Sequence, residues 1–324
     1  MRCASIDLGT NTCLLLIADR QQKSGDSSLD PSPLKRVEDH SRIVRLGQGV
    51  DEARRLAADA MERTLDCLRF YADRVRAQGL EPAKVVCVAT SQARDSVNAS
   101  EFFDRVLQET GFRFQVISGE EEASATFRGA LLPGQSVDDS AVIDIGGGST
   151  EITSRQFTCS IDMGSVRFTE RFLSSDPVTD QEFWACQQAI DDAVYSALKG
   201  KLQEPSKWGG SPSSSLELAA FQGLRFVAVA GTATTLASWH LELEKFDSTL
   251  IDECVLTRGD IHRMVEELKW RTLDERRQLP GIEPKRADVL LAGAMILWRL
   301  MELLGIRDIR VSTRGLRYGL LLER

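Results

Sequence analysis

The chain has 324 residues, of which 42% are hydrophobic and 27% charged, and its formal net charge is −8 at pH 7. This length and composition predict a soluble globular protein with two domains, and the net charge argues against nucleic-acid binding over the whole surface. The longest apolar run, Val289–Trp298, is too short to span a bilayer, and seven scattered cysteines without a signal peptide predict reduced thiols in the cytoplasm.

The N-terminal segment predicts a strand, a tight turn and a second strand. The first strand ends at Asp7, Gly9 lets the backbone turn, and the polar residues Thr10, Asn11 and Thr12 follow. Backbone N–H groups in such a turn can bind a phosphate, and a carboxylate beside them can hold a divalent cation. The turn is therefore a candidate phosphate site.

The next elements predict a layered α/β arrangement. Residues 21–33 are rich in Ser, Asp and Pro and predict a solvated hairpin tip, and a third strand follows at 36–46. The strand predicted at 84–90 is apolar throughout, as in a sheet covered on both faces. Ligands bind at the carboxyl ends of such strands, so Arg94 is a candidate phosphate ligand, with a surface arginine as the open alternative.

The stretch 118–123 predicts a helix start with Ser118 as the N-cap. Glu120, Glu121 and Glu122 lie in its first turn, where the helix dipole favours negative charge whatever their function. Successive helical residues point in different directions, so one of the three can face a functional site. The pattern of residues does not decide which one.

A second hairpin repeats the layout of the first. An apolar strand contains Asp144, three glycines at 146–148 form the turn, and Ser149, Thr150 and Glu151 follow. Two such hairpins in one chain suggest an internal duplication. Facing each other, they would clamp a phosphate and its cation between two domains.

The remaining chain predicts mainly helices. A long helix is expected at 180–201 and a linker-like insertion at Gln203–Ser215. A strand at 226–230 leads into a turn of small residues at 231–235, which suits a phosphate at a helix N-terminus. A buried helix at 289–304, a strand at 309–311 and a C-terminal helix complete the chain.

Seven stretches, in this order, resemble the exopolyphosphatase and guanosine pentaphosphate phosphohydrolase (Ppx/GppA) family in its short two-domain form. They are residues 7–12, 90–95, 118–123, 144–151, 230–237, 286–290 and 314–317. The resemblance implies the actin-like ATPase (ribonuclease H-like) superfold, an α/β fold of two duplicated domains with an interdomain cleft. Residues 1–122 with 309–324 would form the first domain, and residues 123–308 the second.

The resemblance also implies roles for individual residues. Glu122 matches the family's catalytic glutamate, which orients and deprotonates the attacking water. Asp144 and Glu151, with Asp7, would hold Mg²⁺ or another divalent cation. The phosphate-binding residues would be Gly9, Thr10, Asn11, Thr12, Arg94, Gly146, Gly147, Gly148, Ser149, Thr150 and Arg286.

The predicted activity is Mg-dependent release of terminal orthophosphate from inorganic polyphosphate by in-line attack of water. Three alternatives stay open: conversion of pppGpp to ppGpp, a (p)ppGpp-binding regulator with a vestigial site, and a sugar kinase or chaperone-type ATPase of the same superfold. From the resemblance we expect a cytoplasmic homodimer with (p)ppGpp as an inhibitor. No nucleic-acid or membrane partner is expected.

Overall fold

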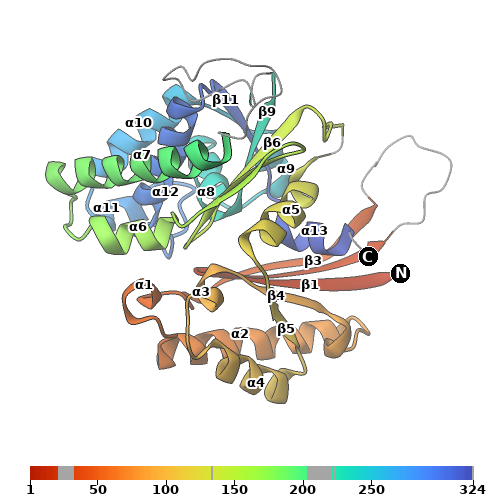
Figure 1. The fold of residues 1–324 in the computed structure, drawn as a ribbon. Coiled ribbons are helices and arrows are strands. Elements are labelled where there is room, and N and C mark those ends of the chain that lie inside the picture. Colours follow the sequence, from red (N-terminus) through yellow and green to blue (C-terminus); the bar gives the residue numbers. More distant parts are fainter. Residues whose placement is uncertain (21–32, 133, 203–220, 222, 323–324) are drawn as a thin grey trace. The chain divides into compact units, whose positions relative to one another are not determined.

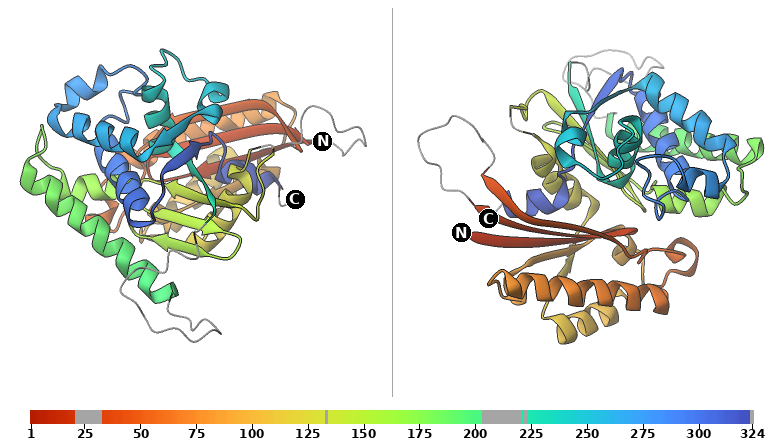
Figure 2. Two further views of the ribbon diagram at one scale, coloured as in Figure 1. Left: turned by 90° about the horizontal axis from the view of Figure 1, so that it is seen from above. Right: turned by 180° about the vertical axis from the view of Figure 1, so that it is seen from behind.

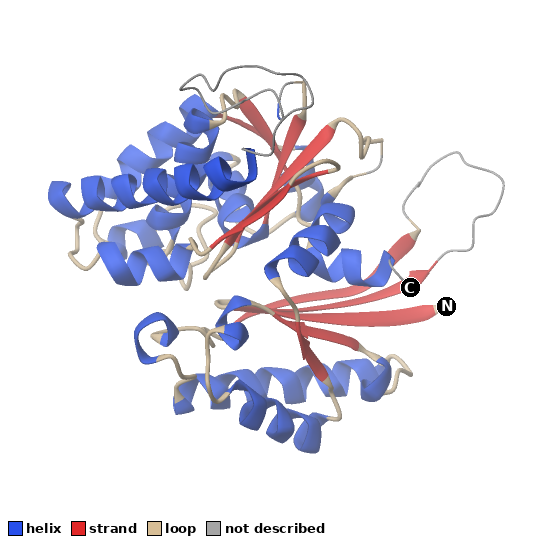
Figure 3. Cartoon of the chain, viewed as in Figure 1, coloured by secondary structure: helices blue, strands red, loops and turns tan. Residues whose placement is uncertain are grey.

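The computed structural model describes residues 1–20, 33–132, 134–202, 221 and 223–322, and its chain separates into two compact units. The first unit comprises Met1–Ser136, Gly146–Gly148 and Arg314–Arg324, and the second comprises Val137–Ile145 and Ser149–Thr313. Each unit contains a mixed sheet with helices packed on it (Figures 1 and 3). Compared with the domain boundaries expected from the sequence, the first unit also includes residues 123–136, and residues 309–313 fall in the second unit.

The first unit is built on a five-stranded sheet in the order β3-β2-β1-β4-β5. Its strands are β1 (Arg2–Leu8), β2 (Thr12–Arg20), β3 (Leu34–Ile43), β4 (Val86–Ala89) and β5 (Phe114–Val116). β1 is antiparallel to β2 and parallel to β4, and β4 is parallel to β5. The carboxyl ends of β1, β4 and β5 therefore meet at one edge of the sheet, where ligands bind in layered α/β folds.

Both faces of this sheet are buried, as the apolar strands predict. Along β2, the side chains of Cys13, Leu15 and Ile17 belong to one core, and those of Leu16 and Ala18 to another. This alternation is the period of two expected for a strand. Helices α2 (Ala58–Ala77) and α4 (Ala99–Thr110) cover one face, and α5 (Gly119–Ala130) and α13 (Leu316–Leu322) cover the other (Figures 1 and 2).

Helices α5 and α13 cross at very short range. A Cβ atom on Gly129 would lie 2.1 Å from the carbonyl oxygen of Gly315, and one on Gly319 would lie 1.8 Å from that of Ala125. Because backbone atoms cannot retreat as a flexible side chain can, both positions require glycine. The crossing fixes α5, which carries the three glutamates, against the sheet.

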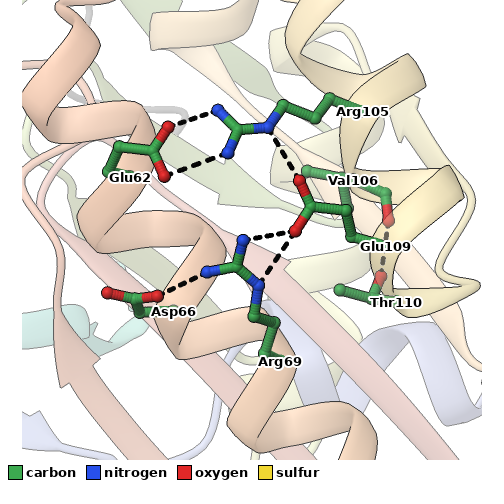
Figure 4. A network of polar contacts seen from close by, with 7 residues as sticks. All are labelled: Glu62, Asp66, Arg69, Arg105, Val106, Glu109 and Thr110. Carbon is green, nitrogen blue, oxygen red and sulfur yellow. Dashed lines mark hydrogen bonds and ion pairs between the residues drawn. The ribbon is translucent and has the colours of Figure 1, made fainter.

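A network of ion pairs joins α2 and α4 on the outer side of the first unit (Figure 4). Nε of Arg105 donates to Oε1 of Glu109 at 2.8 Å, and Arg105 also pairs with Glu62. Nε of Arg69 donates to the other oxygen of Glu109 at 2.9 Å, and Arg69 also pairs with Asp66. These side chains are largely exposed, so water and salt screen the network and its contribution to stability is small.

The second unit repeats the strand order of the first. Its six-stranded sheet has the order β10-β11-β9-β6-β7-β8, and β8-β7-β6-β9-β11 corresponds to β3-β2-β1-β4-β5. The strands are β6 (Ser140–Ile145), β7 (Thr150–Ser154), β8 (Thr158–Ile161), β9 (Arg225–Val229), β10 (Val255–Thr257) and β11 (Asp308–Val311). The duplicated α/β architecture predicted for the actin-like superfold is confirmed.

The duplication extends to single residues at the two hairpins. Asp7 lies opposite Leu14 across β1 and β2, and Asp144 lies opposite Glu151 across β6 and β7. The sequence offset from 7 to 144 equals that from 14 to 151. The two hairpins therefore have turns of equal length and the same register.

The core of the second unit is formed around α12 (Leu290–Leu303), which packs against α6, α7, α8 and α10. Its helices are α6 (Ser165–Phe172), α7 (Asp180–Leu202), α8 (Ala230–His240), α9 (Ser248–Glu253), α10 (Arg258–Trp270), α11 (Leu273–Arg277) and α12. Among the described residues, no helix combines the length and the apolar character that a membrane crossing requires. The predicted insertion Gln203–Ser215 and most of the predicted tip at 21–33 lie outside the described residues.

Candidate active site

The turn between β1 and β2 is held by backbone hydrogen bonds. The N–H of Gly9 donates to the carbonyl of Thr12 at 2.9 Å, which closes the hairpin. The carbonyl of Thr10 accepts from Gly47 at 2.9 Å, and that of Asn11 accepts from the same loop after β3. Gly47 lies so close that a Cβ there would be 2.3 Å from Cγ2 of Thr10. The loop after β3 thus supports the turn and occupies its carbonyl groups.

Side chains that follow β4 hold the same turn. Oγ1 of Thr10 lies 3.0 Å from Oγ of Ser91 and donates to Oε1 of Gln92 at 3.3 Å. Nε2 of Gln92 donates to the carbonyl of Leu8 at 2.7 Å. All three side chains are buried. Sequence reasoning pointed to the stretch 90–95 but singled out only Arg94, because nothing local shows that Ser91 and Gln92 meet Thr10.

The glycine turn also contributes to the first unit. Gly146–Gly148 cluster with that unit, although the strands on either side belong to the second. A Cβ on Gly148 would lie 2.5 Å from Oγ of Ser91 and 3.0 Å from Oγ1 of Thr10. The φ of Gly148 is outside the left-handed region, so its backbone conformation does not require glycine. Close packing against the two hydroxyls is what excludes a side chain there.

The structure separates the roles of the three glutamates at the start of α5. Glu121 forms a capping box with Ser118, whose N–H donates to Oε2 of Glu121 at 2.7 Å. Glu120 is exposed. Glu122 is buried, and only this glutamate of the three forms an ion pair with Arg94.

The ion pair of Glu122 lies at the end of α3 (Ser91–Arg94). Nη1 of Arg94 is 3.1 Å from Oε2 of Glu122 and donates to the carbonyl of Ile117 at 2.7 Å. The side chains are 25% and 11% exposed, so the pair is only partly screened by water. α3 therefore contacts the first turn through Ser91 and the buried glutamate through Arg94.

The second unit contains a pair of facing carboxylates. Asp144 and Glu151 are directly opposite in the antiparallel ladder, so their side chains lie on one face of the sheet, with Cβ atoms typically about 5 Å apart. Glu151 is 2% exposed and accepts a hydrogen bond from Oγ of Ser160 at 2.7 Å. Two carboxylates at this spacing repel each other, and a divalent cation would relieve that repulsion. Their oxygen donors are of the kind that Mg²⁺ prefers.

The expected third metal ligand, Asp7, belongs to the first unit, and its role stays a prediction. Among the described residues there is no group of three or more His, Cys, Asp or Glu side chains that could hold a metal ion. Asp7 lies in the first unit, opposite Leu14 rather than opposite a carboxylate. Burial lowers the pKa of the Arg317 guanidinium, but the charge of Asp39 and its hydrogen bond, with a smaller contribution from the charge of Asp7, outweigh burial and raise the pKa.

The other predicted phosphate ligands lie in the second unit. Ser149 and Thr150 are buried, and Oγ1 of Thr150 donates to the carbonyl of Met163. Arg286 packs on the first turn of α8, where a Cβ on Gly231 would be 1.7 Å from its Nη1. Burial lowers the pKa of the Arg286 guanidinium.

Comparison with known proteins gives matches over almost the whole chain. A model of the Ppx/GppA phosphatase family matches residues 22–324. Exopolyphosphatase 2 of Mycobacterium tuberculosis (strain H37Rv) is 35% identical over 336 residues, which cover 99% of this chain and 98% of that protein. A bifunctional 3-dehydroquinate synthase/phosphatase of Fusobacterium nucleatum is 32% identical over 329 residues, and the chain spans only 46% of its length.

Solved structures give the same result. The crystal structure of an exopolyphosphatase-like protein has a TM-score of 0.85 and 29% identity, covering 100% of this chain and 98% of that one. The Ppx/GppA family member of Aquifex aeolicus has a TM-score of 0.72 and 28% identity, covering 100% and 97%. The likeness therefore includes both units.

Proposed function

Because the chain belongs to the Ppx/GppA phosphatase family, we propose that it is an exopolyphosphatase that releases terminal orthophosphate from inorganic polyphosphate. The family and the exopolyphosphatase relatives indicate a phosphoanhydride hydrolase. The observation that best supports a hydrolytic site is the partly buried ion pair between Arg94 and Glu122, at the carboxyl edge of the first sheet. The short helix α3, which carries Arg94, also contacts the Gly9–Thr12 turn through Ser91.

In this proposal Glu122 is the general base. Hydrolysis of a phosphoanhydride needs an in-line water, neutralised charge on the phosphoryl oxygens and a stabilised leaving phosphate. The Glu122 carboxylate orients the water and accepts its proton. Arg94 fixes that carboxylate from one side, since one of its nitrogens contacts both Glu122 and the carbonyl of Ile117.

The same arginine is suited to bind the substrate. Within the described part of the chain, Nε and Nη2 of Arg94 make no hydrogen bond, while Nη1 makes two. Nε and Nη2 form one edge of the guanidinium fork, which matches two oxygens of a phosphate. The terminal phosphoryl group would lie on this edge, beside the backbone of the turn at Gly9–Thr12.

Asp144 and Glu151 would hold Mg²⁺, with phosphate oxygens and water as further ligands, because Mg²⁺ is commonly bound by only one or two carboxylates. The bound ion would neutralise charge on the phosphate oxygens. Asp7, in the first unit, is proposed as a further ligand of the ion. Ser160 keeps Glu151 oriented by donating to one of its oxygens.

The test is orthophosphate release from polyphosphates of graded length and from pppGpp, each with and without Mg²⁺. The proposal predicts release from polyphosphate that depends on Mg²⁺ and a lower kcat/KM with pppGpp. A higher kcat/KM with pppGpp than with any polyphosphate would replace this proposal by a guanosine pentaphosphatase. Absence of release from every substrate, with tight (p)ppGpp binding by calorimetry, would replace it by a regulator.

A further inference from the structure

In each buried hydrogen bond around Thr10, only one of the two atoms can be the donor. Gln92 donates through Nε2 to the carbonyl of Leu8, which can only accept. Oε1 of Gln92 therefore faces the hydroxyls of Thr10, at 3.3 Å, and Thr90, at 3.4 Å, and it can only accept from them. Turning the amide over would place its oxygen against the carbonyl oxygen of Leu8, which is unfavourable. The orientation of the Gln92 amide is thus fixed by the end of β1.

This orientation determines the protons of both hydroxyls. Thr10 has one hydroxyl proton, and it is directed to Oε1 of Gln92, 3.3 Å away. The contact of 3.0 Å between Thr10 and Ser91 then requires Ser91 to be the donor. Ser91 thus donates to Thr10, and Thr10 donates to Gln92. The hydroxyl proton of Thr10 is therefore not available to a ligand.

We propose that Gln92 is a positioning residue, which holds the phosphate-binding turn by taking the hydroxyl proton of Thr10. Thr10 then contributes its backbone to the phosphate site, and its hydroxyl serves only to anchor the turn. The inference rests on the proposed function, because it needs a phosphate at the turn. It differs from the expectation that the whole Thr10 residue, hydroxyl included, contacts the phosphate.

The packing around the cluster supports an anchoring role. Thr10, Ser91 and Gln92 are 7%, 4% and 2% exposed, so the hydroxyl of Thr10 is enclosed by protein. Gly148, which belongs to the same compact unit, packs against the two hydroxyls and excludes a side chain there. Gln92 also connects two strands, since its amide reaches the end of β1 from the start of α3 after β4.

The variants Gln92→Leu and Thr10→Val each remove one partner of the hydrogen bond. Loss of a buried hydrogen bond that leaves its partner unsatisfied typically weakens an equilibrium about tenfold. We expect each variant to raise KM for tripolyphosphate about tenfold and to change kcat less than threefold, since the turn binds phosphate and Glu122 is untouched. The double variant should cost clearly less than the sum of the two single variants, because both remove the same Thr10–Gln92 hydrogen bond.

Two further variants make the test specific. Thr10→Ser keeps the hydroxyl, so its KM should lie well below that of Thr10→Val. Thr64→Val is the matched control, since Thr64 is a buried threonine on α2 whose hydroxyl donates to the carbonyl of Ala60, and it should leave KM unchanged. Thermal unfolding of each variant reports whether it is folded.

The Kd of tripolyphosphate is measured by calorimetry beside turnover, so that the two proposals are separated. Additive effects of Gln92→Leu and Thr10→Val would show that the two side chains act independently, and would overturn the inference. The inference would also be overturned if Gln92→Leu were folded and had the KM and Kd of the wild type. Binding without hydrolysis by the wild type would contradict the proposed function alone, and the Kd ratios would still decide the inference. Absence of both binding and hydrolysis would overturn both.

Discussion

The turn between β1 and β2 and the turn between β6 and β7 have the same register but different side chains. The position of Leu14 in the first hairpin is occupied by Glu151 in the second, while Asp7 and Asp144 correspond. By the same offset, Gly148 corresponds to Asn11. The two hairpins thus share register and turn length and differ in their side chains. In the proposed function, the first unit provides the anchored turn and Glu122, and the second unit provides Asp144 and Glu151.

The largest effect is expected from the buried glutamate of the first half. Glu122→Gln removes the general base but keeps the shape of the side chain, and the loss of a general base typically lowers the rate about 10²–10⁴-fold. Measured kcat for polyphosphate should fall within this range. The matched control is Glu120→Gln, two residues away and exposed, which should keep the wild-type rate. Equal rates of the two variants would remove Glu122 from catalysis.

The next effect concerns the residue that most distinguishes the two hairpins. Glu151→Leu gives the second hairpin the side chain that the first has at Leu14. Several kcal/mol of charge stabilisation by the cation would be lost, so we expect kcat/KM to fall about 10²-fold and the Mg²⁺ concentration for half-maximal rate to rise. A Mg²⁺ titration of turnover measures both. An unchanged Mg²⁺ requirement would contradict the role of the carboxylate pair.

A smaller effect is expected from the glycines of the two turns. Gly148→Ala would place Cβ 2.5 Å from Oγ of Ser91, whereas Gly9→Ala would meet only the carbonyl oxygen of Thr12 at 3.4 Å, an ordinary contact. We expect Gly148→Ala to lower kcat/KM about tenfold, because such overpacking typically costs 1–3 kcal/mol. The loss for Gly9→Ala should be smaller, and the reverse order would contradict the packing argument.

The smallest effect compares the acid stability of the two units. A hydrogen bond from Arg74 is the main cause that lowers the pKa of Glu38 in the first unit to about 2, from an ordinary value of 4.5. In the second unit, burial raises the pKa of Glu182, but hydrogen bonds from Ser174, Thr179 and Ser175 outweigh it and bring the pKa to about 2. Both carboxylates therefore stabilise the fold above about pH 4.5, and this contribution is lost as the pH falls toward 2.

Glu38→Gln and Glu182→Gln should each flatten the dependence of the unfolding free energy on pH in that window, as measured by urea unfolding between pH 2 and 5. Because Glu38 is held by an ion pair and Glu182 by hydroxyl and backbone groups, added salt should reduce only the contribution of Glu38. Equal salt sensitivity of the two contributions would contradict this distinction. The variants do not touch the turns, so activity at neutral pH should persist.

Much of the fold could be predicted from the sequence because its signals are local. An apolar strand, an aspartate and a glycine turn occur twice, at Asp7 and Asp144, and this repetition indicated the duplication that the sheet orders confirm. The helix predicted at 180–201 also rests on a local pattern, and α7 spans Asp180–Leu202. Contacts between residues that are far apart in the sequence could not be predicted from such local patterns.

The details of the site depend on such contacts. The pattern at 120–122 left three glutamates open, and only the capping box of Glu121 and the ion pair of Glu122 with Arg94, far apart in the sequence, separate them. The role of Gln92 depends on β4 ending beside β1. The metal ligands, the homodimer and the (p)ppGpp inhibitor stay predictions.

The most direct test of the central claim, transfer of the terminal phosphoryl group to water, is hydrolysis of polyphosphate in H₂¹⁸O. Phosphorus NMR then locates the label. We predict one ¹⁸O in each released orthophosphate and none in the shortened chain. Label in the shortened chain, or transfer of the phosphoryl group to an alcohol without labelled orthophosphate, would contradict it.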